Sequence, residues 1–263
     1  ILLGSDNGGT VTPTDGSVTG DKVASTGAFT IGAAGTSSSI AGLPIYVDST
    51  NGSVYTHDVS GTDDTAQNNT AFGLNAADAI TTADSVTVFG RSAGSAITTG
   101  SSSTFFGKEA GLAVTEGTNN IFMGVNAGHD VTTGGSNIAI GATAYDGCDT
   151  ESHNLAIGRD ALGGSVAGSE YNVAIGNYTL DALTSGDYNI AVGYSAGSAV
   201  TTGGENTLMG RSAGAGITIA SYNVAIGSEA LDAVVVERQC TAVGTYALTN
   251  HRTSSSSVND TGN

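Results

Sequence analysis

The sequence has no tryptophan, only two prolines, and few cations: seven lysines and arginines face 24 aspartates and glutamates, for a formal net charge of −17. Nucleic-acid binding requires a basic surface that meets phosphates, and binding to an anionic membrane requires one too, so both classes are disfavoured. No apolar run approaches the roughly 20 residues of a membrane-spanning helix. Strong acidity keeps a β-rich surface soluble and suits an extracellular, cell-surface or virion setting.

Glycine is abundant, with 40 copies in 263 residues. Each glycine inside a helix costs roughly 1 kcal/mol relative to alanine, so this composition disfavours helices. The apolar content of 39% is too high, and too regularly placed, for a disordered chain. We therefore predict an all-β protein.

A repeat runs through most of the chain, marked by eleven glycines that follow one another at 17 residues nine times and at 18 residues once. A fixed period of this size is typical of a solenoid, in which each repeat buries its apolar side by stacking on the next. We predict a parallel β-solenoid of eleven coils, with each glycine at a corner that needs positive φ or the absence of a Cβ. The corner glycines are Gly73, Gly90, Gly107, Gly124, Gly141, Gly158, Gly176, Gly193, Gly210, Gly227 and Gly244.

The residues before each corner glycine read as a strand with two apolar faces. The residue directly before the glycine is large and apolar in all eleven copies, and the one two positions earlier is β-branched in ten. The residue between them is small, usually alanine, and faces the other way. We expect this column of small residues to let a second chain approach closely, in a parallel homo-oligomer that is most simply a trimer. The alternative is a wide single-chain coil with two inner layers. The interface predicted in this way consists of Ala71, Ala139, Ala156, Ala174, Ala191, Ala225 and Ala242.

Asparagine stands four residues before the glycine in eight copies. Stacked identical amides can hydrogen-bond along a fibre axis, so we predict a structural ladder rather than a binding site. The tyrosines that precede three of these asparagines, Tyr171, Tyr188 and Tyr222, should form an outward row. The ladder residues are Asn69, Asn120, Asn137, Asn154, Asn172, Asn189, Asn206 and Asn223.

Seven residues after the glycine an aliphatic side chain recurs, as at Ile80, Val131 and Val200, and a Thr-Thr-Gly type of turn follows it. We interpret the aliphatic column as a second, shorter strand, which gives two strands and two turns per coil, a flattened β-roll.

Four of the seven basic residues follow a corner glycine directly: Arg91, Lys108, Arg159 and Arg211. With acidic residues in the next column, interchain ion pairs are one interpretation. A solvated rim that contributes little per pair is the other.

The flanks lack the repeat. We predict a small N-terminal β region, cap or connector over residues 1–67, the β-roll over 68–250, and a polar tail or linker over 251–263. Cys148 and Cys240 lie five to six coils apart, about 25 Å along the axis at ~4.8 Å per strand. A disulfide spans a Cα separation of only about 4.4–6.8 Å, so we expect both to be free apolar fillers.

Residues for catalysis are sparse. Asp78, Asp146, Asp181 and Asp232 share one column, but none of them occupies adjacent coils. Glycoside hydrolysis usually needs two carboxylates about 5–9.5 Å apart. The four histidines, at 57, 129, 153 and 251, show no metal-ligand spacing, and the phosphate-loop Gly-Lys-Ser/Thr is missing. We predict a protein that is not an enzyme and needs no cofactor or metal.

The repeat motif Asn-x-Ala-x-Gly-x-x-Ala-Gly/Leu is similar to the repeats of two kinds of surface protein. Asn172-Val173-Ala174-Ile175-Gly176 resembles the head repeat of trimeric autotransporter adhesins. The stretch from Asn189 to Gly197, Asn-Ile-Ala-Val-Gly-Tyr-Ser-Ala-Gly, is similar to the repeat of bacteriophage tail fibres. The resemblance covers roughly residues 68–250, and it implies a left-handed, trimeric parallel β-roll on a cell or virus surface.

The function predicted from these features is a structural, adhesive fibre segment of tail-fibre type, whose partners are copies of itself and a cell-surface glycan or protein receptor. One alternative is a subunit of an end-to-end extracellular filament joined through the N-terminal region, and another is a cell-surface trimeric adhesin head. A glycan-cleaving spike needs a pair of carboxylates, and this sequence shows none. An ice-binding solenoid needs threonine on every coil, and the threonine row is broken at Asp149, Val166 and Val235.

Overall fold

The computed structural model describes residues 38–40, 43–48, 51–56, 65–164, 168–233 and 238–249. The predicted polar tail, 251–263, lies outside these residues. So do residues 1–37 of the predicted N-terminal region.

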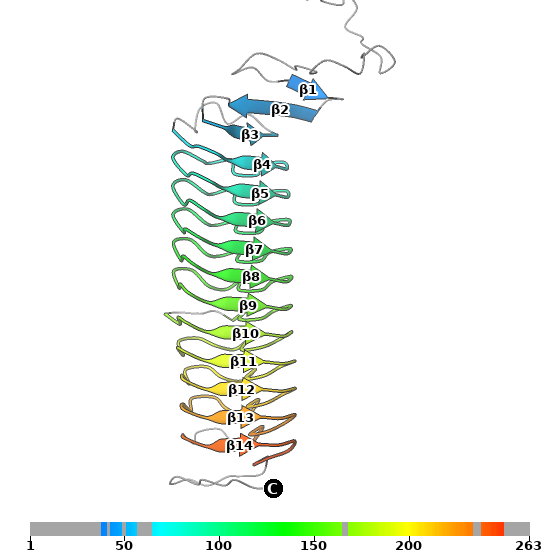
Figure 1. The fold of residues 1–263 in the computed structure, drawn as a ribbon, viewed down its shortest axis with the longest axis vertical. Coiled ribbons are helices and arrows are strands. Elements are labelled where there is room, and N and C mark those ends of the chain that lie inside the picture. Colours follow the sequence, from blue (N-terminus) through cyan, green and yellow to red (C-terminus); the bar gives the residue numbers. More distant parts are fainter. Residues whose placement is uncertain are drawn as a thin grey trace, which may run out of the picture.

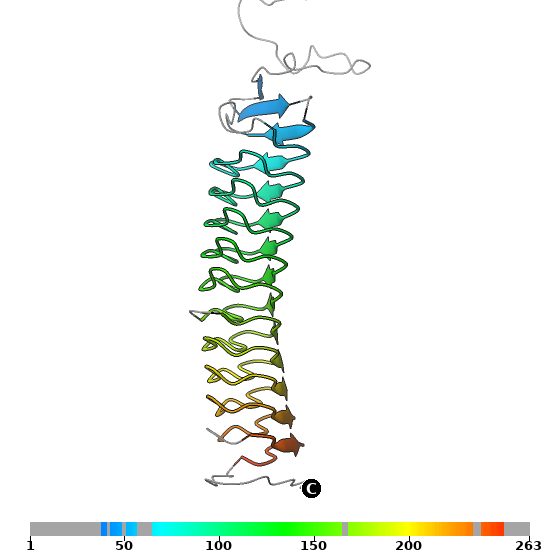
Figure 2. The same ribbon diagram turned by 90° about the vertical axis from the view of Figure 1, so that its left-hand side faces the viewer.

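The fold is a rod of stacked coils whose strands form one sheet along its length (Figures 1 and 2). The described residues contain no helix. The sheet has 14 strands in chain order: β1 (Ser38–Ile40), β2 (Leu43–Asp48), β3 (Ser53–Tyr55), β4 (Thr70–Phe72), β5 (Thr87–Phe89), β6 (Thr104–Phe106), β7 (Ile121–Met123), β8 (Ile138–Ile140), β9 (Leu155–Ile157), β10 (Val173–Ile175), β11 (Ile190–Val192), β12 (Thr207–Met209), β13 (Val224–Ile226) and β14 (Thr241–Val243).

Strands β3 to β14 pair in parallel, each displaced from the next by one repeat, so that Ala174 lies opposite Ala156 on one side and Ala191 on the other. The predicted parallel β-solenoid with a period of about 17 residues is therefore confirmed. β2 runs antiparallel to both β1 and β3. Because β3 pairs in parallel with β4, the parallel stack reaches one strand further toward the N-terminus than residue 68.

Each described coil contains one three-residue strand, and the predicted second strand is wrong. The aliphatic column of Ile80 and Val131 is buried, as expected of core residues, but it lies outside any strand, directly after the turn of each coil. The backbone explains the difference, because residues two and four positions after the corner glycine have positive φ, as at Thr143 (54°) and Tyr145 (58°). Left-handed residues at alternate positions cannot extend into a strand.

The turns are nevertheless hydrogen-bonded from coil to coil. The N–H of Tyr145 donates to the carbonyl of Ala161 at 2.9 Å, and the N–H of Gly128 donates to the carbonyl of Ala144 at the same distance. In the same turn, the N–H of Thr143 donates in the opposite direction, to the carbonyl of Val125 in the preceding coil at 2.9 Å. The coil thus satisfies backbone groups along the rod axis in its turns as well as in its strand, which is what a glycine-rich chain without helices requires.

The corner glycines behave as predicted. Their φ values lie between 125° and 144°. A Cβ on Gly124 would stand 2.2 Å from the carbonyl oxygen of Gly141 in the next coil. Glycine is needed here both for its backbone conformation and for the close approach of stacked coils.

The core keeps its volume by a size trade-off between two positions in each coil. The middle residue of the strand and the residue six positions later fill the same space. Where the strand carries Phe122, the later residue is Gly128, and a Cβ there would lie 2.6 Å from the phenyl ring. Where the strand carries Ala139, the later residue is Tyr145, which is 1% exposed. Large-then-glycine pairs are Val88/Gly94, Phe105/Gly111, Phe122/Gly128 and Leu208/Gly214; alanine-then-large pairs are Ala139/Tyr145, Ala156/Leu162, Ala174/Leu180, Ala225/Leu231 and Ala242/Leu248.

Two coils carry small residues at both positions, and neighbouring coils fill them. At Ala191/Gly197, methyl carbons of Leu180 and Leu208 each lie 2.8 Å from the place of a Cβ on Gly197. At Ala71/Ala77, the buried Tyr55 of β3 lies opposite Ala71 in the sheet. Close packing along the rod is thus maintained across coils as well as within them.

Candidate functional site

The seven alanines predicted to face a second chain lie inside the coil instead, so that prediction is wrong. None is more than 2% exposed: Ala71, Ala139, Ala156, Ala174, Ala191, Ala225 and Ala242. The reason is the size trade-off of the core. Tyrosine or leucine from the turn occupies the interior above most of these alanines, and only a small strand residue fits beneath it.

The opposite side of the strands faces outward. We define the outer face as the first and third residues of β4–β14. It carries large apolar side chains that are 37–58% exposed, and its 22 positions include no charged residue. The exposed members are Phe72, Phe89, Phe106, Ile121, Met123, Ile140, Ile190, Met209, Ile226 and Val243. A long uncharged strip of this kind is unusual on a protein surface exposed to water.

At the N-terminal end of the outer face the phenyl rings form a stack. The ring centroids of Phe72 and Phe89 lie 4.9 Å apart, and those of Phe89 and Phe106 lie 5.0 Å apart, with nearly parallel planes. The spacing follows the separation of neighbouring strands. The rings therefore cover one another's faces and leave their edges outward.

The four cations after corner glycines border the outer face, and each is paired within its own chain. Lys108 Nζ lies 3.2 Å from Glu109, which also accepts from Arg91 of the preceding coil. Arg211 pairs in the same way with Glu229. The predicted interchain pairing stays a prediction. The intrachain pairs are exposed, and such pairs contribute little individually.

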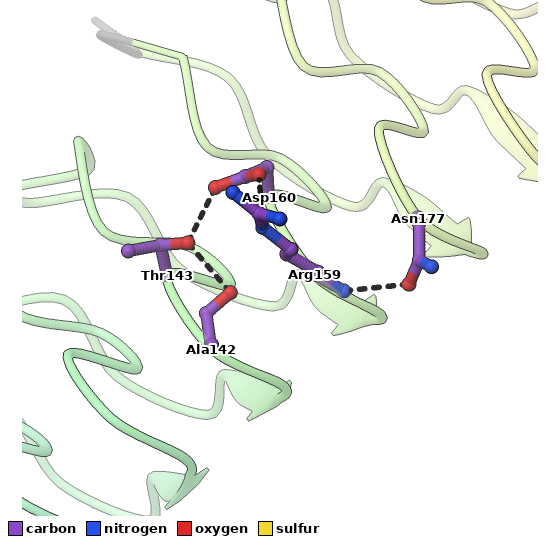
Figure 3. Close-up of polar contacts among 5 residues, drawn as sticks. All are labelled: Ala142, Thr143, Arg159, Asp160 and Asn177. Carbon is purple, nitrogen blue, oxygen red and sulfur yellow. Dashed lines mark hydrogen bonds and ion pairs between the residues drawn. The ribbon is translucent and has the colours of Figure 1, made fainter.

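Arg159 shows how this column ties coils together (Figure 3). Its backbone N–H donates to Asn177 Oδ1 at 2.9 Å, and its Nε lies 3.1 Å from Asp160 Oδ2. The Thr143 hydroxyl of the preceding coil bonds the Asp160 carboxylate. The polar edge of the outer face is therefore held in place by contacts along the rod.

The asparagine ladder is confirmed as a buried structural element. Asn189 illustrates it: its backbone N–H donates to Asn172 Oδ1 at 2.8 Å, and its Nδ2 donates to the same oxygen at 3.1 Å and to the carbonyl of Gly203 at 2.9 Å. The eight ladder residues are at most 2% exposed: Asn69, Asn120, Asn137, Asn154, Asn172, Asn189, Asn206 and Asn223. A buried amide with its donors and acceptor engaged stabilises the stack and offers nothing to a ligand.

A polar cluster that we did not predict lies beside the 18-residue repeat. Glu151 is only 4% exposed, and its carboxylate accepts N–H bonds from Asp149 (2.9 Å), Thr150 (3.0 Å) and Gly168 (2.8 Å). In regular coils a backbone carbonyl of the next coil has this role, as the carbonyl of Thr115 does for the N–H groups of residues 98–100. The signal in the sequence is a glutamate in a column that holds glycine or alanine in most other coils.

Tyr145 and Cys148 complete this cluster. The Tyr145 hydroxyl donates to the carbonyl of Glu151 at 3.2 Å and accepts from Asn154 Nδ2 at 2.8 Å. Burial raises the pKa of the Tyr145 hydroxyl and of the Cys148 thiol, so both stay neutral and unreactive near pH 7. Cys148 and Cys240 are buried and free, which confirms the prediction of no disulfide between them.

Among the described residues, the carboxylates and histidines are spread over several coils. Partial burial is the main cause that raises the pKa of Asp146 and of Asp181. His129 lies 2.5 Å from Asp130, and His57 and His251 fall outside the described residues. Within the described ranges no group of three or more His, Cys, Asp or Glu side chains has the arrangement of a metal site.

The tyrosine row is exposed, as predicted. Tyr171 stacks on Tyr188 with ring centroids 5.1 Å apart and on His153 at 4.9 Å. Tyr222 lies two coils further, and a hydrogen bond to Glu205 raises the pKa of its hydroxyl. The threonine rows differ, because hydroxyls such as that of Thr98 donate to the carbonyl of the next coil, at 3.1 Å. Those hydroxyls hold coils together, and this does not favour an ice-binding surface.

Comparisons with protein-family models, with curated proteins and with solved structures gave no match to this chain. In the part of the chain that the structure describes, no helix has the length and apolar character needed to cross a membrane.

Proposed function

We propose that this chain is a shaft segment of an extracellular, cell-surface or virion fibre, with a structural and adhesive role and self-association into a homo-oligomer, most simply a trimer. The observation that carries the proposal is the stack of 12 parallel strands, with axial hydrogen bonds in strands and turns alike. Such a rod becomes long by repeating one short sequence motif, and it exposes turns along its whole length.

The side chains support a structural role over a catalytic one. The polar residues inside the rod, such as Asn189 and Glu151, are engaged in coil-to-coil or local backbone contacts. The exposed turns carry the tyrosine row and most of the acidic residues, and they are the parts that would meet a receptor glycan or protein. The strongly acidic surface favours solubility outside the cell.

Immunogold labelling tests the proposed location. An antibody raised against the chain is applied to intact cells, and to virions where they occur, from the organism that encodes the gene. We expect labelled fibres on the surface, and labelled recombinant protein should bind matching host cells in a saturable way. Labelling confined to the cell interior, with no binding to any cell surface, contradicts the proposal.

An end-to-end filament is the second candidate, and the uniform stacking of the coils favours it. At the corner glycines from Gly73 to Gly227 the place of a Cβ faces the backbone of the next coil, so successive coils meet through the same surface. A coil of a second chain can stack on the rod through that same surface. Electron microscopy separates the two candidates, since a filament grows in length with protein concentration and a fibre segment has a fixed length.

A further inference from the structure

We infer that the outer face of β4–β14 is where copies of this chain pack against one another, with their rod axes side by side. The inference rests on the proposed self-association and names its surface. This surface is the side of the sheet opposite to the one that the alanine column suggested.

The outer face is large enough to be an interaction surface. Eleven strands at ~4.8 Å and three residues at ~3.3 Å give a strip about 50 Å long and about 10 Å wide, roughly 500 Å² in projection. Contiguous exposed apolar patches above a few hundred Å² mark interaction sites. The adjoining column adds Leu74, Val125 and Tyr194, which are 68%, 49% and 54% exposed. They bring the area toward the ~800 Å² that each partner buries in a standard interface.

The outer face also shows a size trade-off like the one in the core. The three coils with phenylalanine in the third strand position have threonine in the first: Thr70/Phe72, Thr87/Phe89 and Thr104/Phe106. Six of the other eight coils pair two aliphatic side chains, as Ile138/Ile140 does. Water imposes no such balance, but a packed neighbour does, because an interface needs a continuous surface without gaps or protrusions.

The regular repeat of the outer face identifies the neighbour as another copy. A strip of even bulk that repeats with every strand matches a partner whose own side chains recur with the same spacing over the same length, and this chain is such a partner. Charge points the same way. Copies that each carry −17 repel one another, and the repulsion is smallest where the facing positions hold no carboxylate.

The first test measures mass by size-exclusion chromatography with light scattering. We expect the natural sequence to give a fixed multiple of 25.8 kDa, and a Met123→Glu/Ile140→Glu variant to fall to the mass of one chain. Ile219→Glu is the matched control, because Ile219 is 50% exposed but lies in a turn outside the outer face. It should keep the multiple. A natural chain that is monomeric at every concentration, or a folded double variant that keeps the multiple, overturns the inference.

Cross-linking covers the case in which the charged variant fails to fold. β9 is the middle strand of β4–β14, so its outward residues meet whether the copies run parallel or antiparallel. Ile157→Cys should give a disulfide-linked pair of chains on mild oxidation, and Ile219→Cys should not. The natural cysteines are buried and do not interfere. Absence of the linked pair, or equal linkage in both variants, contradicts the inference.

The outcomes separate this inference from the proposed function. If the chain is monomeric but the antibody still labels surface fibres, only the proposed packing surface is contradicted. If the chain self-associates but is found only inside cells, only the proposed extracellular role is contradicted.

Discussion

Two stretches of the rod reach the same core volume from opposite sides. In β5–β7 the strand supplies the bulk, with Phe105 and Phe122, and the turn supplies glycine. In β8–β10 the strand supplies alanine, and the turn supplies Tyr145, Leu162 and Leu180. The parallel strand register continues through both stretches, and so do the coil-to-coil bonds donated by the fourth residue after the corner glycine, as at Gly128 and Tyr145. The backbone and the corner are therefore fixed elements, while the source of the core bulk is interchangeable.

The largest effect should come from the element that both stretches share. Gly124→Ala and Gly158→Ala each place a Cβ within 2.2 and 2.5 Å, respectively, of backbone atoms in the next coil, at φ above 130°. We expect each to lower the free energy of unfolding by more than about 4 kcal/mol, or to prevent folding. Thermal unfolding followed by circular dichroism checks this. A mild effect at either site means that neighbouring coils can separate locally.

Removing the strand-supplied bulk comes next. Phe122→Ala should cost about 3–5 kcal/mol, because a buried phenyl ring is replaced by a cavity. Gly128→Leu alone should also destabilise, because its Cβ lies 2.6 Å from the Phe122 ring. The double variant recreates the arrangement of Ala156 and Leu162 and should recover much of the loss. A double-mutant cycle in urea measures the coupling, and strictly additive losses contradict the trade-off.

The carboxylate beside the irregular repeat should matter less. Glu151→Ala takes the acceptor from three backbone N–H groups, and leaving buried donors unpaired costs about 1–3 kcal/mol. Glu116→Ala is the control, since Glu116 is exposed. Amide hydrogen exchange should show faster exchange at Asp149, Thr150 and Gly168 in the Glu151 variant. Unchanged exchange there means that water replaces the carboxylate.

The smallest effect concerns Asp146, whose pKa is raised mainly by partial burial. A pKa higher in the folded chain than in the unfolded chain means that the folded state holds the proton more tightly. This contribution to stability is present at low pH and is lost as pH rises through the raised pKa. Asp146→Asn should therefore raise the melting temperature slightly at pH 7 but not at pH 3. Glu116→Gln removes the same charge from an exposed site. An equal gain from both variants assigns the effect to net charge instead.

The corner glycines and the ladder could be predicted because they depend on local chemistry. Gly124 needs a conformation that only glycine adopts readily, and Asn189 needs an identical amide one period away. The pairing of a large residue at Phe122 with a glycine six residues later, at Gly128, is also visible in the sequence. It can be interpreted as a trade-off in core volume only when both positions are known to point inward. The second strand was mispredicted because apolar recurrence at Val131 marks burial and not backbone conformation.

The period, the all-β class, the parallel stacking, the buried asparagine ladder and the absence of a disulfide between the cysteines follow from the sequence alone. Which face of each strand lies inside becomes known only in the folded chain. A two-residue alternation separates the faces without saying which one is enclosed, and here both are apolar. The choice depends on the space left by side chains from the turns, and those turns fold inward through left-handed residues such as Tyr145. As a result, the alanines line the interior, and the phenylalanines and isoleucines form the outer face.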